Sequence, residues 1–401
     1  MARIVLGVSG GIAAYKGCEV LRRLTEAGHR VRVVPTAAAL QFVGAPTWAA
    51  LSGEPVTADP FDDAHAVPHV RLGQDTDLVL VVPATANLLA KATHGLADDL
   101  LTNVLLTARC PVVMAPAMHT EMWEQAATVA NVATLRERGV LVLEPAVGRL
   151  TGADSGKGRL PDPDAIVAVA EQVLARPSAA PDLLGRTVVV SAGGTREPVD
   201  PVRFLGNRSS GRQGYALATA AVSRGARVEL VSANVTLPDP AGATVHRVET
   251  AAELKDAVLG LAPSAHAVVM AAAVADFRPS GVSDHKIKKD QGVPTMLLSP
   301  TDDVLAALVA GRGHGQVVVG FAAETGDDEA DWRAHGAAKL ARKGCDLLVV
   351  NEVGPGLAFG TTDNAAVVLG RDGSVTEVER GPKAALAHRV WDLVVQRLPA
   401  H

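Results

Sequence analysis

Short apolar runs alternate with alanine-rich stretches along most of the chain. In the first half the runs fall at 3–8, 30–35, 77–82, 111–115 and 140–143, and in the second half near 187–192, 227–232, 266–272, 316–321 and 346–350. Runs of this length between turn residues predict buried strands, and the stretches that separate them predict crossover helices. The alternation is typical of mostly parallel sheets, so we predict an α/β fold with doubly wound sheets.

Turn residues refine this prediction at two places. Residues 13–27 predict a helix, and Gly28 follows as its C-terminal stop. Near the other end, residues 365–379 alternate around Asp372-Gly373, a dipeptide that favours tight hairpin turns. We therefore expect the chain to finish with an antiparallel hairpin.

The length predicts two domains. A single hydrophobic core rarely grows past about 250–300 residues, and this chain has 401. The segment 176–184, RPSAAPDLL, has two prolines and small residues and is the best linker. We predict domains at 1–175 and 185–401.

Composition excludes several classes of protein. The net charge of −5 argues against a nucleic-acid-binding surface, so anion binding must come from local clusters. The three cysteines are scattered and form no disulfide framework. The chain enters a strand directly, without a signal-peptide layout, and has no apolar run of about 18 residues. We expect a cytoplasmic protein that binds neither nucleic acid nor membrane.

Residues 188–215, VVVSAGGTREPVDPVRFLGNRSSGRQGY, carry the strongest local signal. An apolar strand breaks at Gly193-Gly194, where glycine permits backbone conformations that other residues avoid. Pro198 and Pro201 then keep the chain extended. A second polar loop, 207–211, opens onto a helix predicted from about Gln213.

Amides at that helix start would provide a seat for phosphates, and Ser209 or Ser210 is a candidate cap. Four arginines surround the two loops, namely Arg196, Arg203, Arg208 and Arg212. An ordinary strand–turn–helix crossover is the alternative. Two consecutive glycine-bearing loops with several arginines favour a nucleotide or phosphate site.

The first half has a second candidate ligand-binding site, at the carboxyl edge of its predicted sheet. Strand 3–8 runs into Ser9-Gly10-Gly11, whose amides and hydroxyl suit a phosphate, although a structural turn explains the same residues equally well. Thr36, Thr85 and Asn87 follow other strands and would meet at the carboxyl edge of the sheet. Helix capping by Thr85 or Asn87 is an equal alternative.

The second half resembles the phosphopantothenate–cysteine ligase family in a series of motifs. The motifs are AGGTREP at 192–198, N-x-S-S-G at 207–211, AAAVADF at 271–277, KIKK at 286–289, GFAAET at 320–325, the lysines Lys339 and Lys343, and Asn351. The resemblance implies activation of a carboxylate as an acyl-nucleotide, followed by attack of the cysteine amine. Phosphates in such a step need neutralisation by Mg²⁺ and cationic side chains.

Roles follow by resemblance, residue by residue. Lys286 is implied as the catalytic lysine that contacts the nucleotide, and Asn207 as the uncharged donor to the oxyanion of the second step. The resemblance also implies a CTP site made of Met270, Ala271, Ala272, Asp276, Lys286, Thr301, Asp302, Asp303, Val304, Phe321, Lys339 and Lys343. By themselves, KIKK also fits a solvated loop and Phe321 also fits core packing. The residues identify no metal ligands.

Residues 1–175 resemble the cysteine-decarboxylase flavoproteins. The match lies in SGGIAAYK (9–16), PTAAA (35–39), PATANLLAKATHGLADDLLT (83–102), PAMHTEMW (116–123) and GKGRLP (156–161). It implies an FMN site at Ser9, Gly10, Gly11, Thr36, Thr85 and Asn87. It also implies that His69 is the active-site histidine, with His65 as the competing candidate.

Two positions depart from that family. His119 stands where the family has asparagine, thought to hold the substrate carboxylate, and histidine can also donate to a carboxylate. Gly152 stands where the family's flap has a proton-donating cysteine. Asp154, Ser155, His119 or an ordered water are candidate replacements.

The order of the two halves resembles the bacterial bifunctional decarboxylase/ligase family of coenzyme A synthesis. It implies two Rossmann-like domains, a flavodoxin-like flavoprotein half and a nucleotide-binding ligase half. The expected reactions are CTP-dependent condensation of 4'-phosphopantothenate with cysteine and FMN-dependent decarboxylation of the product to 4'-phosphopantetheine. Trimers of the flavin half and dimers of the ligase half would combine in a homo-dodecamer.

Three other functions are weighed against this one. Gly152 and His119 motivate a ligase whose flavin-binding half is inactive. A flavin-binding regulatory subunit is opposed by the intact ligase motifs. A nicotinamide dehydrogenase is opposed because neither half has a full G-x-G-x-x-G with an acidic residue about twenty positions later.

Overall fold

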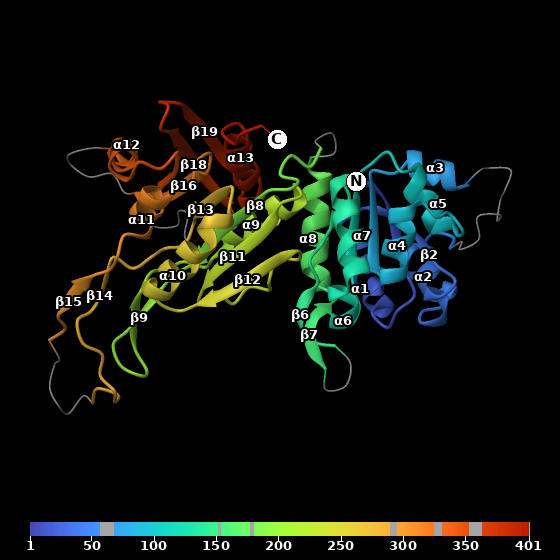
Figure 1. Ribbon diagram of the computed structural model, residues 1–401, viewed down its shortest axis with the longest axis horizontal. Coiled ribbons are helices and arrows are strands. Elements are labelled where there is room, and N and C mark those ends of the chain that lie inside the picture. Colours follow the sequence, from blue (N-terminus) through green and yellow to red (C-terminus); the bar gives the residue numbers. More distant parts are fainter. Residues whose placement is uncertain are drawn as a thin grey trace. The chain divides into compact units, whose positions relative to one another are not determined.

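The computed structural model describes residues 1–56, 68–150, 154–176, 180–288, 295–324, 331–352 and 363–400. The chain forms two compact units. The first comprises Met1–Gly185, Val222–Ala226 and Pro238–Ala243, and the second comprises Arg186–Ala221, Arg227–Leu237 and Thr244–His401. Figure 1 shows both, and each is described by itself.

A five-stranded parallel sheet forms the centre of the first unit. Its strands are β1 (Arg3–Val8), β2 (Arg30–Pro35), β3 (Leu78–Ala84), β4 (Val112–Pro116) and β5 (Leu141–Val142). Their order is β2-β1-β3-β4-β5, and each neighbouring pair is parallel. The chain winds outward from β1 in one direction and from β3 in the other, which is the predicted doubly wound arrangement.

Helices cover this sheet in two groups. The helices are α1 (Ala14–Glu26), η1 (Ala39–Gln41), α2 (Ala45–Ser52), α3 (Pro68–Gln74), α4 (Ala86–His94), α5 (Leu100–Thr107), α6 (Thr120–Glu124), α7 (Ala126–Glu137) and α8 (Pro163–Leu174). Helix α1 packs with α2 and α8, whereas α4 packs with α5 and α7. Right-handed crossovers place the two groups on opposite faces of the sheet.

A short antiparallel hairpin, β6 (Ala146–Arg149) with β7 (Ser155–Arg159), extends the first unit beyond the sheet. Its sequence is rich in glycine and charge and lacks an apolar alternation, so the apolar pattern did not predict it. The described part of the hairpin brings residues that follow β5 close to residues that follow β4.

An eight-stranded sheet forms the centre of the second unit. In spatial order its strands are β12 (Ala243–Val248), β11 (Arg227–Ala233), β8 (Thr187–Gly193), β13 (Ala267–Met270), β16 (Val317–Glu324), β17 (Leu347–Glu352), β18 (Asp363–Gly370) and β19 (Val375–Pro382). The strands from β11 to β17 pair in parallel. The last three strands pair antiparallel, which confirms the predicted terminal hairpin around Asp372-Gly373.

Helices and two short ladders complete the second unit. The helices are α9 (Arg212–Ser223), α10 (Ala251–Leu261), η3 (Ala262–Ser264), α11 (Val304–Gly311), α12 (Trp332–Lys343) and α13 (Lys383–Val395). The ladders pair β9 (Arg196–Pro198) with β10 (Phe204–Gly206) and β14 (Phe277–Pro279) with β15 (Leu298–Pro300). Figure 1 shows β9, β14 and β15 projecting beyond the end of the large sheet.

Branched aliphatic side chains fill both cores. Val5, Val79 and Val81 are buried in the first unit, and Val189, Val268 and Val318 in the second. Tryptophans Trp48 and Trp391 are fully buried, and each indole N–H donates to a carbonyl, of Val43 and Leu217 respectively. Within the described residues, no helix is both long and apolar enough to span a membrane.

Gly193 allows the end of β8 to touch the end of β11. Its φ is 89°, and a Cβ atom there would lie 1.9 Å from the carbonyl oxygen of Ala233. We expect Gly193→Ala to destabilise the second unit by at least about 2 kcal/mol, because it adds a backbone clash to left-handed strain. Denaturant unfolding measures this effect.

Gly281→Ala is the matched control, since no heavy atom lies within 4 Å of a Cβ atom there. Equal stability of the two variants would contradict the close approach of the two strand ends.

Candidate active sites

Ser9 connects two strand ends at the carboxyl edge of the first sheet. Its hydroxyl donates to the carbonyl of Pro83 at 2.8 Å and accepts the N–H of Thr85 at 2.9 Å. The Ser9 side chain is 2% exposed, so these bonds are shielded from water. The residue therefore fixes the loop after β1 against the loop after β3.

Gly10 allows the loop after β2 to lie against the loop after β1. A Cβ atom on Gly10 would lie 2.4 Å from the Cβ atom of Ala38, and the N–H of Thr36 donates to Val8 at 2.9 Å. The structure thus collects Ser9, Gly10, Thr36 and Thr85 at one edge of the sheet, as predicted from the positions of the strands.

Backbone N–H donors at this edge are available to a ligand. Helix α1 has no side-chain cap, and the N–H groups of Gly10, Gly11 and Ile12 have no hydrogen-bond partner among the described residues. A helix start with free amides favours an anionic group.

Thr85 caps α4, which confirms the capping interpretation for this residue. Its hydroxyl accepts the N–H of Leu88 at 3.4 Å. Asn87 lies one residue inside the helix and is exposed, so it does not cap α4. A capping hydroxyl keeps its own hydrogen for a ligand.

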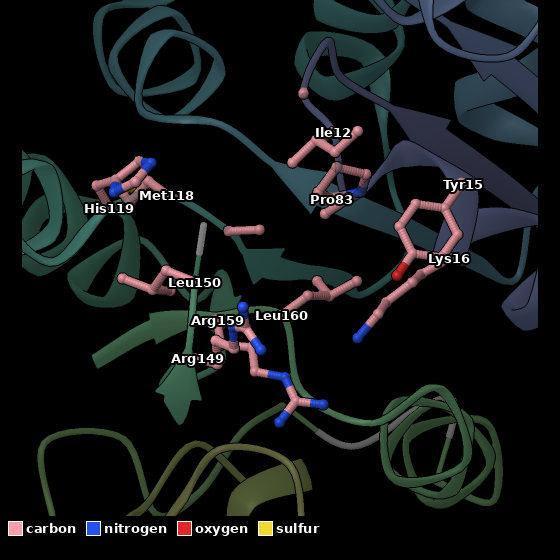
Figure 2. Close-up of a pocket in the computed structure, with 13 residues that line it drawn as sticks. Ile12, Tyr15, Lys16, Pro83, Met118, His119, Arg149, Leu150, Arg159 and Leu160 are labelled. Carbon is pink, nitrogen blue, oxygen red and sulfur yellow. The ribbon is translucent and has the colours of Figure 1, made fainter. Parts of the chain in front are cut away.

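A cavity of about 440 Å³ opens beside this edge. It is lined by Gly11, Ile12, Ala13, Tyr15, Lys16, Pro83, Ala117, Met118, His119, Arg149, Leu150, Arg159 and Leu160. Figure 2 shows His119 and Met118 on one side and Tyr15 with Lys16 on the other. Gly11 and His119 are the predicted site residues that line it.

The hairpin β6–β7 closes one wall of this cavity because its glycines admit a close backbone approach. A Cβ atom on Gly158, whose φ is 153°, would lie 2.2 Å from the carbonyl oxygen of Met118. One on Gly156 would lie 2.2 Å from the hydroxyl of Thr120. The N–H of Met118 also donates to Gly158 at 3.0 Å.

Glu144 anchors the same hairpin. Its carboxylate lies 2.8 Å from Arg136 and 2.6 Å from Lys157 of β7. Burial pushes the pKa of Glu144 upward, but the two cations outweigh burial and hold the pKa below its usual range. Glu144 therefore stays ionised and keeps Lys157 in place.

His119 stands at the end of the cavity nearest the hairpin tip. It immediately precedes α6, and its Nδ1 lies 4.0 Å from a carboxylate oxygen of Asp154. Its side chain is 45% exposed, so it can reach a ligand in the cavity. The predicted active-site histidine His69 lies on α3. His65 and Gly152 lie outside the described residues.

In the second unit, the loop after β8 is held by Asn234. Its side-chain amide donates to the carbonyls of Gly194 and Glu249 at 2.9 Å each, from a left-handed backbone with φ of 54°. Helix α9 begins at Arg212, one residue earlier than predicted. Gly211 precedes it, and Ser209 accepts the Gly211 N–H at 3.4 Å instead of capping the helix.

Asn207 lies beside the loop that follows β13. Its side-chain amide donates to the carbonyl of Val274 at 3.1 Å, and the buried hydroxyl of Thr195 accepts the N–H of Ala275 at 2.9 Å. Asp276 follows directly and is exposed. Asn207 and Asp276, far apart in sequence, are therefore brought to the carboxyl ends of β8 and β13.

Asp200 positions the segment that carries Lys286, a role that the sequence motifs did not reveal. Its carboxylate accepts the N–H groups of Val202 and Arg203 at 2.8 Å each and that of Ile287 at 3.2 Å. Burial pushes the pKa of Asp200 upward, but these N–H donors lower it below its usual range. The exposed Lys286 is thus attached to a fixed backbone.

The other predicted phosphate-binding lysines are paired with carboxylates. Lys339 lies 2.8 Å from Glu324, and Lys343 is paired with Asp303. Asp303 also caps α11 by accepting the N–H of Ala306 at 3.0 Å. An incoming phosphate would therefore compete with acidic side chains for these lysines.

Of the remaining residues predicted for the nucleotide site, two are buried in the core and two are held by other residues of the second unit. Met270 and Val304 are buried in the core, so they offer a ligand only their backbone. Thr301 donates its N–H to Asp276 at 3.0 Å, and Asp302 pairs with Lys255 at 2.7 Å.

Phe321, Ala271 and Ala272 line a cavity of about 150 Å³ with Ser209, Gly211 and Arg212. The same cavity contains Asn351, Asn364 and Lys383, of which only Asn351 belongs to a motif that the sequence singled out. Four arginines were predicted to surround the phosphate-binding loops. Of these, Arg212 lines this cavity, whereas the guanidinium carbon of Arg196 lies 4.5 Å from the centre of the Phe204 ring.

The described residues contain no group of three or more His, Cys, Asp or Glu side chains that could hold a metal ion.

Two family models match the two halves of the chain. Residues 1–175 match the family described as flavoprotein, and residues 183–398 match the family described as DNA/pantothenate metabolism flavoprotein C-terminal domain. A coenzyme A biosynthesis bifunctional protein of Mycobacterium bovis is 59% identical over 401 residues, which cover 98% of this chain and 96% of that protein. The chain belongs to the coenzyme A biosynthesis bifunctional protein family. As predicted, it is a bifunctional enzyme with decarboxylase and ligase domains.

More distant members of this family also match over nearly the whole chain. The Bacillus subtilis protein is 43% identical over 379 residues, covering 94% of this chain and 92% of its own.

Solved structures match each half separately. The C-terminal domain of a coenzyme A biosynthesis bifunctional protein is 32% identical, with a TM-score of 0.46 and coverage of 54% of this chain and 97% of that one. A PPC decarboxylase complexed with pantothenoylaminoethenethiol is 30% identical, with a TM-score of 0.40. The match covers 42% of this chain and 96% of that one.

Replacing Asp200 tests the positioning of Lys286. We expect Asp200→Asn to lower ligase kcat at least about tenfold, because the amide cannot accept all three N–H donors and Arg203 loses its partner. The folded pKa of Asp200 is depressed, so its contribution is complete above the unfolded pKa and is lost only as pH falls through the folded value. The defect should therefore persist at neutral pH.

The control is Asp284→Asn, an exposed carboxylate on the same segment. Decarboxylation should be unchanged in both variants. Equal ligase activity of Asp200→Asn and wild type would show that the carboxylate does not position Lys286.

Proposed function

We propose that the second unit condenses 4'-phosphopantothenate with cysteine through an acyl-cytidylate formed from CTP. The first unit then decarboxylates the resulting 4'-phosphopantothenoylcysteine to 4'-phosphopantetheine with FMN. The observation that carries this proposal is the gathering of the sequence-predicted residues at the carboxyl edges of the two parallel sheets, where α/β enzymes bind their ligands.

The first unit offers FMN a phosphate seat and a neighbouring cavity. The unpaired amides of Gly10 and Gly11 would hold its phosphate, and Thr36 and Thr85 offer uncharged hydroxyls to its polar groups. FMN, when bound, would supply the oxidising power that makes loss of CO₂ from the cysteinyl group easy, and in its reduced form the electrons that convert the oxidised product to 4'-phosphopantetheine. His119 can donate a hydrogen bond to the departing carboxylate, and Pro83 and Met118 exclude water.

The second unit would use different groups for its two steps. Lys286 would neutralise charge on the α-phosphate during formation of the acyl-cytidylate. The side-chain amide of Asn207, beside the Val274 carbonyl, would donate to the oxyanion when the cysteine amine attacks. Mg²⁺ would enter with the triphosphate, as it does where phosphates supply most of its oxygen ligands, and the exposed Asp276 is an available carboxylate.

We further propose that the chain assembles into a dodecamer through trimers of the first unit and dimers of the second. Large apolar side chains near the FMN seat support contacts there, since Ile12 is 69% exposed and Tyr15 is 59% exposed. Neighbouring Phe42 is 50% exposed.

Purified protein should be yellow and should release CO₂ repeatedly from 4'-phosphopantothenoylcysteine, because His119 and other groups replace the family's asparagine and flap cysteine. The measurements are the visible spectrum, the identity of the extracted flavin and the CO₂ formed per flavin. A colourless protein that does not take up FMN excludes the flavin site. One CO₂ per flavin would favour the alternative of a ligase with an inactive flavin-binding half.

Lys286→Ala and Asn207→Ala should each abolish net ligation while CO₂ release continues. Asn207→Asp should still release pyrophosphate from CTP, because Asn207 acts only on the second step. A CTP-dependent pyrophosphate assay with and without cysteine distinguishes the steps. Loss of both ligation and decarboxylation in a folded, yellow variant would contradict separate sites in the two units.

A further inference from the structure

The cavity of the first unit has a strongly cationic side. Lys16, Arg149 and Arg159 line it, and none of its described lining residues is acidic. Figure 2 shows the two arginines extending from the hairpin below the cavity and Lys16 reaching toward them from α1. His119, which would hold the substrate carboxylate, lies on a different side of the cavity from these cations.

The three cations are placed by two separate elements. Lys16 lies in the first turn of α1, whereas Arg149 ends β6 and Arg159 ends β7. The Arg159 side chain lies across Gly148, where a Cβ atom would be 3.2 Å from its Nη1. Glycine at that position therefore lets the guanidinium lie flat against the hairpin, toward the cavity.

Lys16 and Arg159 are close enough to repel each other. Partial burial and then the charge of Arg159 lower the pKa of Lys16, and Asp162 and Glu19 offset only part of this effect. An anion between them would relieve the repulsion and gain charge-assisted hydrogen bonds, which guanidinium groups form well with phosphate.

The rest of the cavity matches a long, bipolar molecule. Its other walls are largely apolar, formed by side chains such as Leu150, Leu160 and Pro83. A ligand with a carboxylate at one end, a phosphate at the other and a chain of methylene, methyl and amide groups between them would place both charged ends against suitable side chains. The decarboxylase substrate has this construction.

We propose that Lys16, Arg149 and Arg159 form a subsite for the 4'-phosphate of the decarboxylase substrate, so that the enzyme selects phosphorylated over dephosphorylated pantothenoylcysteine. The inference rests on the proposed decarboxylation and specifies which part of its substrate these residues bind. The His119 side of the cavity takes the carboxylate in the same arrangement.

The test compares 4'-phosphopantothenoylcysteine with pantothenoylcysteine in wild type, Arg149→Gln and Arg159→Gln, by CO₂ release at several substrate concentrations. Wild type should prefer the phosphorylated substrate. Each variant should raise KM for that substrate roughly ten- to a hundredfold, as expected for loss of a hydrogen bond to a charged group. The kinetics with pantothenoylcysteine should not change.

Lys157→Gln is the matched control, because Lys157 is a cation of the same hairpin that pairs with Glu144 and does not line the cavity. Whatever it does to overall activity, it should leave the ratio of kcat/KM for the two substrates unchanged. Equal losses with both substrates in the arginine variants would overturn the subsite. Loss of bound FMN in those variants would also overturn it, since the cations would then serve the flavin phosphate.

Failure of the proposed function has a different signature. In that case wild type releases CO₂ from neither substrate, and the subsite is tested by calorimetric binding of 4'-phosphopantetheine and pantetheine to wild type and Arg159→Gln. Tighter binding of the phosphorylated compound that is lost in Arg159→Gln supports the subsite. Equal binding by the two proteins rejects it.

Discussion

Both sites depend on close contact between backbone segments at the ends of parallel strands. Gly193 lets the end of β8 meet the carbonyl of Ala233, and Gly10 lets the loop after β1 meet Ala38. Side chains at these points would separate the loops by the width of at least a methyl group. The short loops then fix their remaining polar groups, such as Ser9 in the first unit and Thr195 in the second, within hydrogen-bond distance of the neighbouring strand's loop.

Buried or half-buried carboxylates provide the next level of organisation. Asp200 binds three backbone N–H groups, and Glu144 binds two cations, so each remains ionised in spite of its burial. Neither needs to touch a ligand, because each fixes a segment that carries a side chain proposed to bind one. Breaking such an arrangement is costly, since it leaves a charged group without its partners.

The candidate ligand-binding cations of the two units have different surroundings. In the second unit Lys339 and Lys343 are paired with Glu324 and Asp303, so a triphosphate would have to displace acids that already hold these lysines. In the first unit Lys16 and the two hairpin arginines face a cavity with no acidic lining residue among those described.

The sequence by itself predicted most strands of the two main sheets, their mostly parallel arrangement and the terminal hairpin, because side-chain periodicity and turn residues act over a few positions. Its motifs also identified the family and placed Ser9, Asn207 and Lys286 at strand ends. It did not show that the Ser9 hydroxyl accepts the N–H of Thr85, that Asp200 accepts the N–H of Ile287, or that Lys16, Arg149 and Arg159 line one cavity. These contacts join residues from different elements, and a local pattern carries no information about which distant charge lies within a few ångströms. Only the tertiary structure decided those partners, since electrostatic and hydrogen-bond energies depend on distance in space.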